Sequence, residues 1–139
     1  MSQVYELITP GAIPVALNDM KSYMKVTSTS DDALITSMLS AATTYGEGYT
    51  VREFRANTWT LHLDAFTDRI CLRRAPVDAI TTVKYLVSAT LETVADTVYY
   101  LKENLQNAEI LLQEDQAWPT DMDNREQAIE ILFVTKAYR

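Results

Sequence analysis

The side chains that most often perform catalysis are few in this sequence, and they do not converge. A serine or cysteine hydrolase needs its nucleophile within hydrogen-bond reach of a histidine, but the only histidine, His62, lies nine residues before the only cysteine, Cys71. His62 falls in an alternating pattern typical of a strand, and the apolar Ile70 and Leu72 flank Cys71. We therefore expect His62 on the surface of a sheet, Cys71 in a core or sheet, and no enzymatic activity.

Metal and phosphate sites are disfavoured by composition. Zinc sites need clusters of cysteine and histidine, and a phosphate-binding loop needs glycines before a helix. The carboxylates of residues 121–124 alternate as in a calcium loop, but the glycine and the final glutamate of such a loop are missing. Glu114 and Asp115 are adjacent, so on a strand they would point to opposite faces. We predict a solvated acidic loop, no catalytic residue, no metal and no cofactor.

Arginine and aromatic residues instead suggest contacts with other proteins. Arg73 and Arg74 precede Pro76, and arginines leaving a strand before a proline turn can pair with carboxylates of a neighbouring subunit; the alternative is two solvated side chains. Trp118 lies between two predicted strands and could anchor either the sheet or a partner. Tyrosine and tryptophan, of which the chain has eight and two, are enriched where protein surfaces meet.

Two helices are predicted before any of these residues. Residues 15–26 carry apolar side chains at spacings of three and four, which indicates a short amphipathic helix. A second apolar stripe predicts a long helix from about Asp31 to Arg52, with Ser30 able to cap its start. Gly46 and Gly48 weaken its last turns, so an end near Tyr45 is the competing boundary.

Beyond residue 56 the apolar period changes from helical to two, as in half-buried strands. We expect strands over Thr58 to Asp64, Arg69 to Leu72, Ile80 to Val87, Thr97 to Leu101, Glu109 to Gln113 and Ala128 to Thr135. The predicted fold is α+β, with one domain of 139 residues in which a helical part (about 15–56) precedes an antiparallel sheet or small sandwich (57–139).

The net charge and the cysteine count indicate which partners and which compartment suit the protein. The net charge is −7, of which residues 57–139 carry −5, so the molecule as a whole repels phosphate backbones and sequence-specific DNA binding is disfavoured. A single cysteine cannot form an internal disulfide, which fits a reducing compartment such as a bacterial cytoplasm. No signal-peptide pattern or run of eighteen apolar residues occurs, so we expect neither secretion nor membrane insertion.

The order of these features resembles the tailed-phage head-tail connector family, also described as adaptor, head completion or DNA-packaging proteins. The resemblance covers nearly the whole chain, and its specificity lies in the order and spacing of segments. These segments are residues 17–26, 31–35, 41–42, 47–52, 59–66, 70–77, 80–85, 99–101, 118–119 and 129–134.

This resemblance implies a structural virion protein at the head-tail interface, made in the cytoplasm of a bacterial host. Such proteins form a ring, most often of about twelve subunits, below the portal and above the stopper or tail. Genome DNA passes through the ring without sequence-specific binding, which suits an acidic subunit. Relatives usually continue after the last strand with a Gly-Tyr segment and a helical region, whereas alanine replaces that glycine here. A portal-docking element is accordingly expected to be absent or replaced.

Ring closure requires one patch of each subunit to meet a different patch of the next. We expect the long helix to pack one face on its own sheet and to present its polar face, with Arg52 and Arg55 at its end, to acidic strand edges or loops of the next subunit. Other candidate interface residues are Arg73, Arg74, Trp118, Tyr138 and Arg139. The alternative function is a standalone β-rich binding module, perhaps another virion or tail component, in which the sheet carries the contact.

Overall fold

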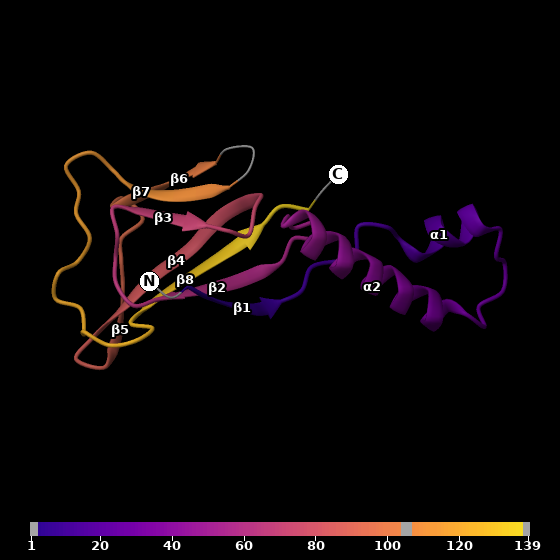
Figure 1. Ribbon diagram of the computed structural model, residues 1–139, viewed down its shortest axis with the longest axis horizontal. Coiled ribbons are helices and arrows are strands. Elements are labelled where there is room, and N and C mark those ends of the chain that lie inside the picture. Colours follow the sequence, from indigo (N-terminus) through magenta and orange to yellow (C-terminus); the bar gives the residue numbers. More distant parts are fainter. Residues whose placement is uncertain (1–2, 104–106, 138–139) are drawn as a thin grey trace.

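The computed structural model describes residues 3–103 and 107–137, and it confirms the predicted α+β class (Figure 1). Two helices, α1 (Leu17–Met24) and α2 (Asp32–Thr50), lie between the first strand and seven further strands in the chain. The strands are β1 (Val4–Thr9), β2 (Thr58–Leu63), β3 (Arg69–Leu72), β4 (Val77–Val87), β5 (Thr90–Thr93), β6 (Tyr99–Glu103), β7 (Ala108–Leu112) and β8 (Ile129–Thr135).

The longer of the two predicted ends of α2 is correct. The helix continues through Gly46 and Gly48, and Val51 ends it with a left-handed φ of 55°. At Gly46 the ring of Phe54 lies 2.8 Å from where a Cβ would be, so the glycine gives that ring its place against the helix. The predicted cap is wrong, because Asp31 is the N-cap and the Ser30 hydroxyl lies 3.1 Å from the Ser28 hydroxyl.

The strands form two antiparallel sheets. The larger has the order β1-β2-β8-β4-β5, and the smaller has the order β3-β7-β6. The six strands predicted from alternation are present with ends shifted by at most a few residues, whereas β1 and β5 were not predicted. β5 follows a two-residue turn in which Ser88 and Ala89 have positive φ, a conformation usually signalled by glycine or asparagine.

The hydrophobic core lies between the two sheets. Its fully buried members from β2 and β8 include Leu61, Leu63, Ile131 and Phe133, and the smaller sheet contributes Ile70, Leu72 and Ile110. Each such side chain stabilises the folded state by roughly 1.5–3 kcal/mol relative to exposure. The two sheets therefore bury each other's apolar faces, and no helix is needed between them.

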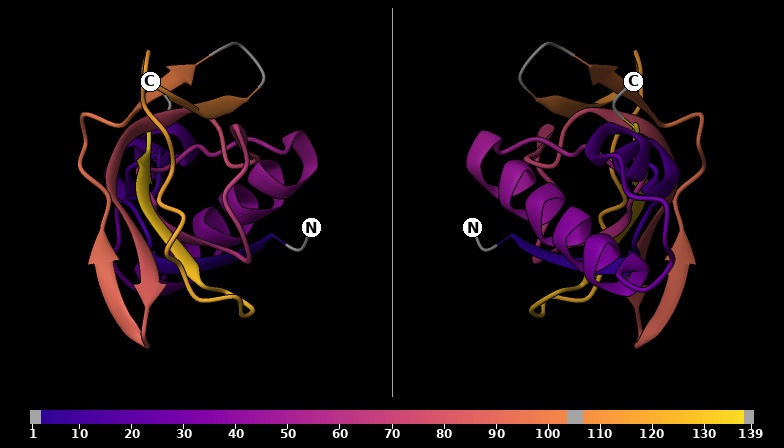
Figure 2. Two further views of the ribbon diagram at one scale, coloured as in Figure 1. Left: turned by 90° about the vertical axis from the view of Figure 1, so that its left-hand side faces the viewer. Right: turned by 90° about the vertical axis from the view of Figure 1, so that its right-hand side faces the viewer.

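The helices project from one end of the two sheets as an arm (Figure 1). We call residues 17–50, which comprise α1, α2 and their connection, the helical arm. Viewed along the long axis, α2 lies on the opposite side of the molecule from β5 (Figure 2). The two helices contact each other, and the Lys21 ammonium pairs with the Asp32 carboxylate at 2.7 Å. Within the described residues, no helix is long and apolar enough to cross a membrane.

Candidate subunit interface

The apolar stripe of α2 faces solvent, which corrects the expectation that it packs on the chain's own sheet. Leu34, Met38, Tyr45 and Tyr49 are 55%, 61%, 74% and 80% exposed, and Ile35 is the one buried apolar side chain of the helix. At 100° per residue these four positions fall within about 60° of one another. The stacked rings of Tyr45 and Tyr49, with centroids 6.3 Å apart, form its broadest part.

The short helix continues this apolar surface. Tyr23 is 84% exposed and Met24 is 41% exposed. Between the helices lies a hollow of about 190 Å³ lined by Met20, Met24, Ile35, Met38, Leu39 and Ala42. Exposed apolar surface of this extent marks a protein contact or an aggregation hazard. We call Leu34, Met38, Tyr45 and Tyr49 the arm stripe.

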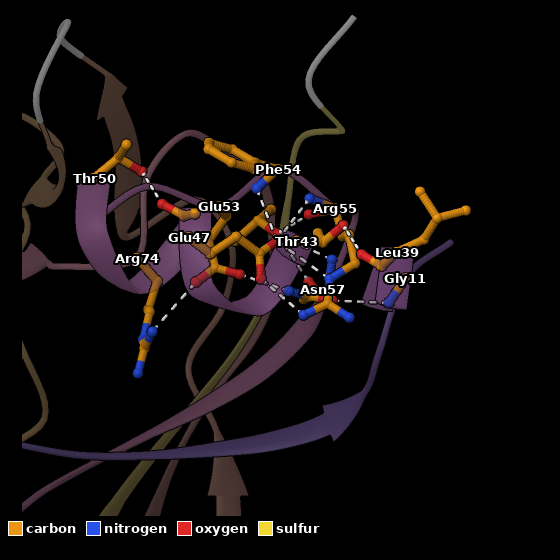
Figure 3. Close-up of polar contacts among 12 residues, drawn as sticks. Gly11, Leu39, Thr43, Glu47, Thr50, Glu53, Phe54, Arg55, Asn57 and Arg74 are labelled. Atoms are coloured by element: carbon orange, nitrogen blue, oxygen red, sulfur yellow. Dashed lines mark hydrogen bonds and ion pairs between the residues drawn. The ribbon is translucent and has the colours of Figure 1, made fainter. Parts of the chain in front are cut away.

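The direction of the arm is fixed at its base by Glu47 (Figure 3). One carboxylate oxygen, Oε1, accepts hydrogen bonds from the backbone N–H of Phe54 at 2.9 Å and of Arg55 at 3.2 Å. The Arg55 guanidinium donates to Oε1 at 3.2 Å and to Oε2 at 2.7 Å. Burial by itself raises the pKa of this carboxyl, but the hydrogen bonds from Arg55 and Phe54 outweigh it and hold the pKa below its ordinary value.

A second buried carboxylate, Glu53, ties the base of the arm to the larger sheet. Its oxygens accept hydrogen bonds from the Asn57 amide, from the Trp59 indole at 3.2 Å and from the Arg74 guanidinium at 3.3 Å. The Arg74 guanidinium also lies over the Trp59 ring, 4.3 Å from its centroid. Buried carboxylates are stable only when paired in this way.

The last strand completes the same network. The Thr135 hydroxyl in β8 accepts the N–H of Asn57 at 2.9 Å and donates to the carbonyl of Arg55 at 2.7 Å. The side-chain carbonyl of Asn57 accepts the N–H of Gly11 at 2.8 Å, which joins the segment before α1 (Figure 3). We call Glu47, Glu53, Arg55, Asn57, Arg74 and Thr135 the arm joint.

Four of the predicted interface residues divide into two kinds. Arg55 and Arg74 are neutralised inside the chain by Glu47 and Glu53. Arg52, at the end of α2, and Arg73, just after β3, are exposed, and neither forms an ion pair with a described residue. The sequence alone could not separate these pairs, because Glu47 and Arg55 meet only after the chain turns at Val51.

The remaining predicted residues lie elsewhere. Trp118 packs on the sheet: its ring stacks on Phe66 with centroids 4.6 Å apart, and its indole N–H donates to the carbonyl of Thr67 at 2.9 Å. Only 9% of its surface is exposed, so of its two predicted roles the structure shows the sheet contact. Tyr138 and Arg139 lie outside the described residues.

The histidine and the acidic residues that were candidates for catalysis or metal binding make contacts within the fold. His62 is half-buried on β2 and lies 3.2 Å from the Glu6 carboxylate of β1. Both carboxylate oxygens of Asp123 accept backbone N–H groups, those of Ser88 and Ala89, at 2.9 Å each. Over residues 3–103 and 107–137, no three side chains of the metal-binding types lie together. His62 and Asp123 therefore make contacts within the fold.

Comparison with known proteins agrees with this picture. The sequence model of a family described as phage gp6-like head-tail connector protein matches residues 14–116. No curated protein matches the chain significantly.

Solved structures from gene transfer agent (GTA) particles share the fold. A chain from the neck of an empty GTA particle computed with C6 symmetry is 20% identical, with a TM-score of 0.77 over 95% of this chain and 70% of the other. A chain from the virion of a native GTA particle is 23% identical, with a TM-score of 0.75 over 94% and 70%. One from a native GTA neck computed with C12 symmetry is 23% identical, with a TM-score of 0.70 over 95% and 69%.

Proposed function

Because this chain belongs to the phage gp6-like head-tail connector family, as its sequence had indicated, we propose that it is the adaptor subunit of a ring. The ring joins the portal of a phage or phage-like head to the stopper or tail. The chain is a structural connector, and nothing in the proposed task requires catalysis. Its place is the head-tail interface of the particle, after synthesis in the host cytoplasm.

The observation that carries this proposal is the exposed arm stripe. A ring needs a heterologous interface, in which a surface of one subunit meets a different surface of the next. The stripe stands on a helix that leaves the sheets, so a second copy can cover it without displacing any part of its own chain. Two tyrosines supply the large, rigid contact area typical of interface centres.

The ring we propose has about twelve subunits. Related folds occur in GTA necks computed with C6 and C12 symmetry, which supports a cyclic arrangement. Double-stranded DNA passes through the lumen in this proposal. A subunit of net charge −7 presents a wall that does not bind phosphates tightly, so DNA can move through it without sequence-specific contacts.

The alternative function is a standalone binding module whose sheet carries the contact. One observation favours it: β1 is an edge strand, with Val4, Leu7 and Ile8 between 40% and 49% exposed. An open edge can accept an added strand from a partner. In that case a single subunit would bind without forming a ring.

The deciding experiment is mass determination of the purified protein, alone and mixed with portal, over a range of concentrations. Oligomers of about twelve subunits, or a stable portal complex, support the adaptor. A monomer under every condition overturns it in favour of the module.

Two matched variants test whether the arm stripe is the contact. Tyr45→Asp places a charge on the stripe, whereas Thr44→Asp places the same charge on an exposed position about 100° round the helix. We expect the first to abolish assembly and the second to leave it nearly unchanged. Equal assembly of both variants would show that the ring, if formed, uses another surface.

A further inference from the structure

A concave basic surface lies where the arm meets the smaller sheet. It is a hollow of about 530 Å³ lined by Thr50, Val51, Arg52, Cys71, Arg73 and Asn107. These residues come from the end of α2, from β3 and its end, and from the start of β7. We call it the basic hollow.

The basic hollow has an unbalanced positive charge. Neither Arg52 nor Arg73 forms an ion pair with any residue in the described part of the chain, although Arg55, Arg74 and Arg69 each have a carboxylate partner. Arg73 also lines an adjoining hollow of about 290 Å³. Two exposed guanidinium groups beside a concavity, in a chain of net charge −7, are suited to planar carboxylates, which arginine binds with two parallel hydrogen bonds.

The strongest negative segment of the chain lies far from the arm. The connection between β7 and β8, residues 113–127, carries five carboxylates and one arginine, so it holds most of the excess negative charge. Glu114, Asp115, Asp121 and Glu126 are exposed there. Figure 1 shows this connection at the opposite end of the long axis from α1. We call it the acidic loop.

We propose that the basic hollow of one subunit binds the exposed carboxylates of the acidic loop of the next subunit. This rests on the proposed ring, and it names a second contact beside the arm stripe. A heterologous interface requires complementary patches at different places on one chain. In a closed ring, the basic hollow and the acidic loop of every subunit would each be in contact with a neighbour. The same charges select the direction in which subunits dock, because the reverse contact would bring like charges together.

The partner is a second copy rather than DNA because the symmetry of a ring brings a neighbour's acidic loop to the same position at every joint. A phosphate backbone that approaches the basic hollow would meet a chain with a net negative charge. Screening gives a first test: raising the salt concentration from about 0.1 M to 1 M shortens the Debye length from about 10 Å to 3 Å. We expect the concentration for half-maximal wild-type assembly to rise at least about tenfold over this range.

A charge exchange gives the sharper test. We expect Arg52→Glu with Arg73→Glu to raise the half-maximal assembly concentration at least about tenfold, and Glu114→Arg with Glu126→Arg to do the same. Combining all four substitutions should restore most of the assembly. Lys25→Glu with Lys102→Glu, which reverses two other exposed cations, should have little effect. Circular dichroism of each variant confirms that folding is retained.

The outcomes separate this inference from the proposed function. Rings that form normally in the Arg52→Glu, Arg73→Glu variant, or four substitutions that restore nothing, overturn the hollow-to-loop contact while the ring stands. If the Arg52→Glu, Arg73→Glu variant forms normal rings but particles carrying it no longer package DNA, the hollow-to-loop contact is also overturned, because that result would assign the basic hollow to nucleic acid. A wild-type chain that stays monomeric even with portal overturns both proposals.

Discussion

Replacing Glu47 with alanine removes the acceptor on which the base of the arm depends. The carboxylate receives four hydrogen bonds, two from backbone N–H groups and two from the Arg55 guanidinium. Both side chains of the pair are shielded, at 9% and 12% exposed, so the substitution leaves a guanidinium without its counter-charge. Breaking such a pair from one side typically costs 3–5 kcal/mol, and we expect about that loss in the free energy of unfolding.

The assay is urea unfolding followed by circular dichroism and by tryptophan fluorescence. Trp59 donates to Glu53 in the arm joint, whereas Trp118 is stacked on Phe66 in the hydrophobic core. With Trp118→Phe, the fluorescence comes from Trp59 alone, which lies in β2 beside the joint, while circular dichroism follows the strands of both sheets. A loss confined to the Trp59 signal would indicate that the arm detaches before the sheets unfold, as expected for a locally less stable unit.

Two controls separate charge pairing from general damage. Glu92→Ala removes an exposed carboxylate outside the acidic loop and should change stability by no more than about 0.5 kcal/mol. In the double variant with Arg55→Ala, much of the loss should be recovered, giving a coupling energy of at least about 1.5 kcal/mol. A Glu47→Ala protein within about 1 kcal/mol of wild type, or additive effects in the double variant, would refute the role given to this pair.

Three further predictions follow from the same structure. The hydrogen-bonded Glu47 has a folded pKa below its unfolded value of about 4.3. Its contribution to the free energy of unfolding is therefore present above that pH and is lost as pH falls through the folded pKa. Urea midpoints measured between about pH 6 and 3 should fall more for wild type than for Glu47→Gln. Gly48→Ala, with open space around the new methyl group, should stabilise the protein by up to about 1 kcal/mol, whereas Gly46→Ala should destabilise it by pressing on Phe54; thermal melting compares them. Asp123→Ala should cost about 1–3 kcal/mol and speed amide hydrogen exchange in β5, because two turn N–H groups lose their acceptor.

The sequence predicted the helices and six strands because each carries a strong apolar period. The strand β1 was missed because it is an edge with exposed apolar side chains, and β5 because its turn contains neither glycine nor asparagine. Periodicity also identified the stripe of α2 correctly, but it reports only that one face is apolar. Which surface covers that face is decided by the path of the chain after Val51, where Glu47, Phe54 and Arg55 meet.

The sequence predicted the candidate interface only in part, because it does not show which side chains meet within the folded chain. Four arginines were selected by position, and only the fold shows that two of them are already neutralised by Glu47 and Glu53. Neither glutamate has a sequence signal of its own, since their partners lie at separations of eight and twenty-one residues.

The position of β8 in the larger sheet determines when the chain can mature. This strand follows all the others in the described chain, yet it lies between β2 and β4 and supplies the Thr135 hydroxyl to the arm joint. During synthesis, β1 can pair with β2 and β4 with β5, but these two pairs of strands remain unconnected until β8 leaves the ribosome. Such long-range pairing is slow to form. The arm joint is therefore complete only after translation of this strand.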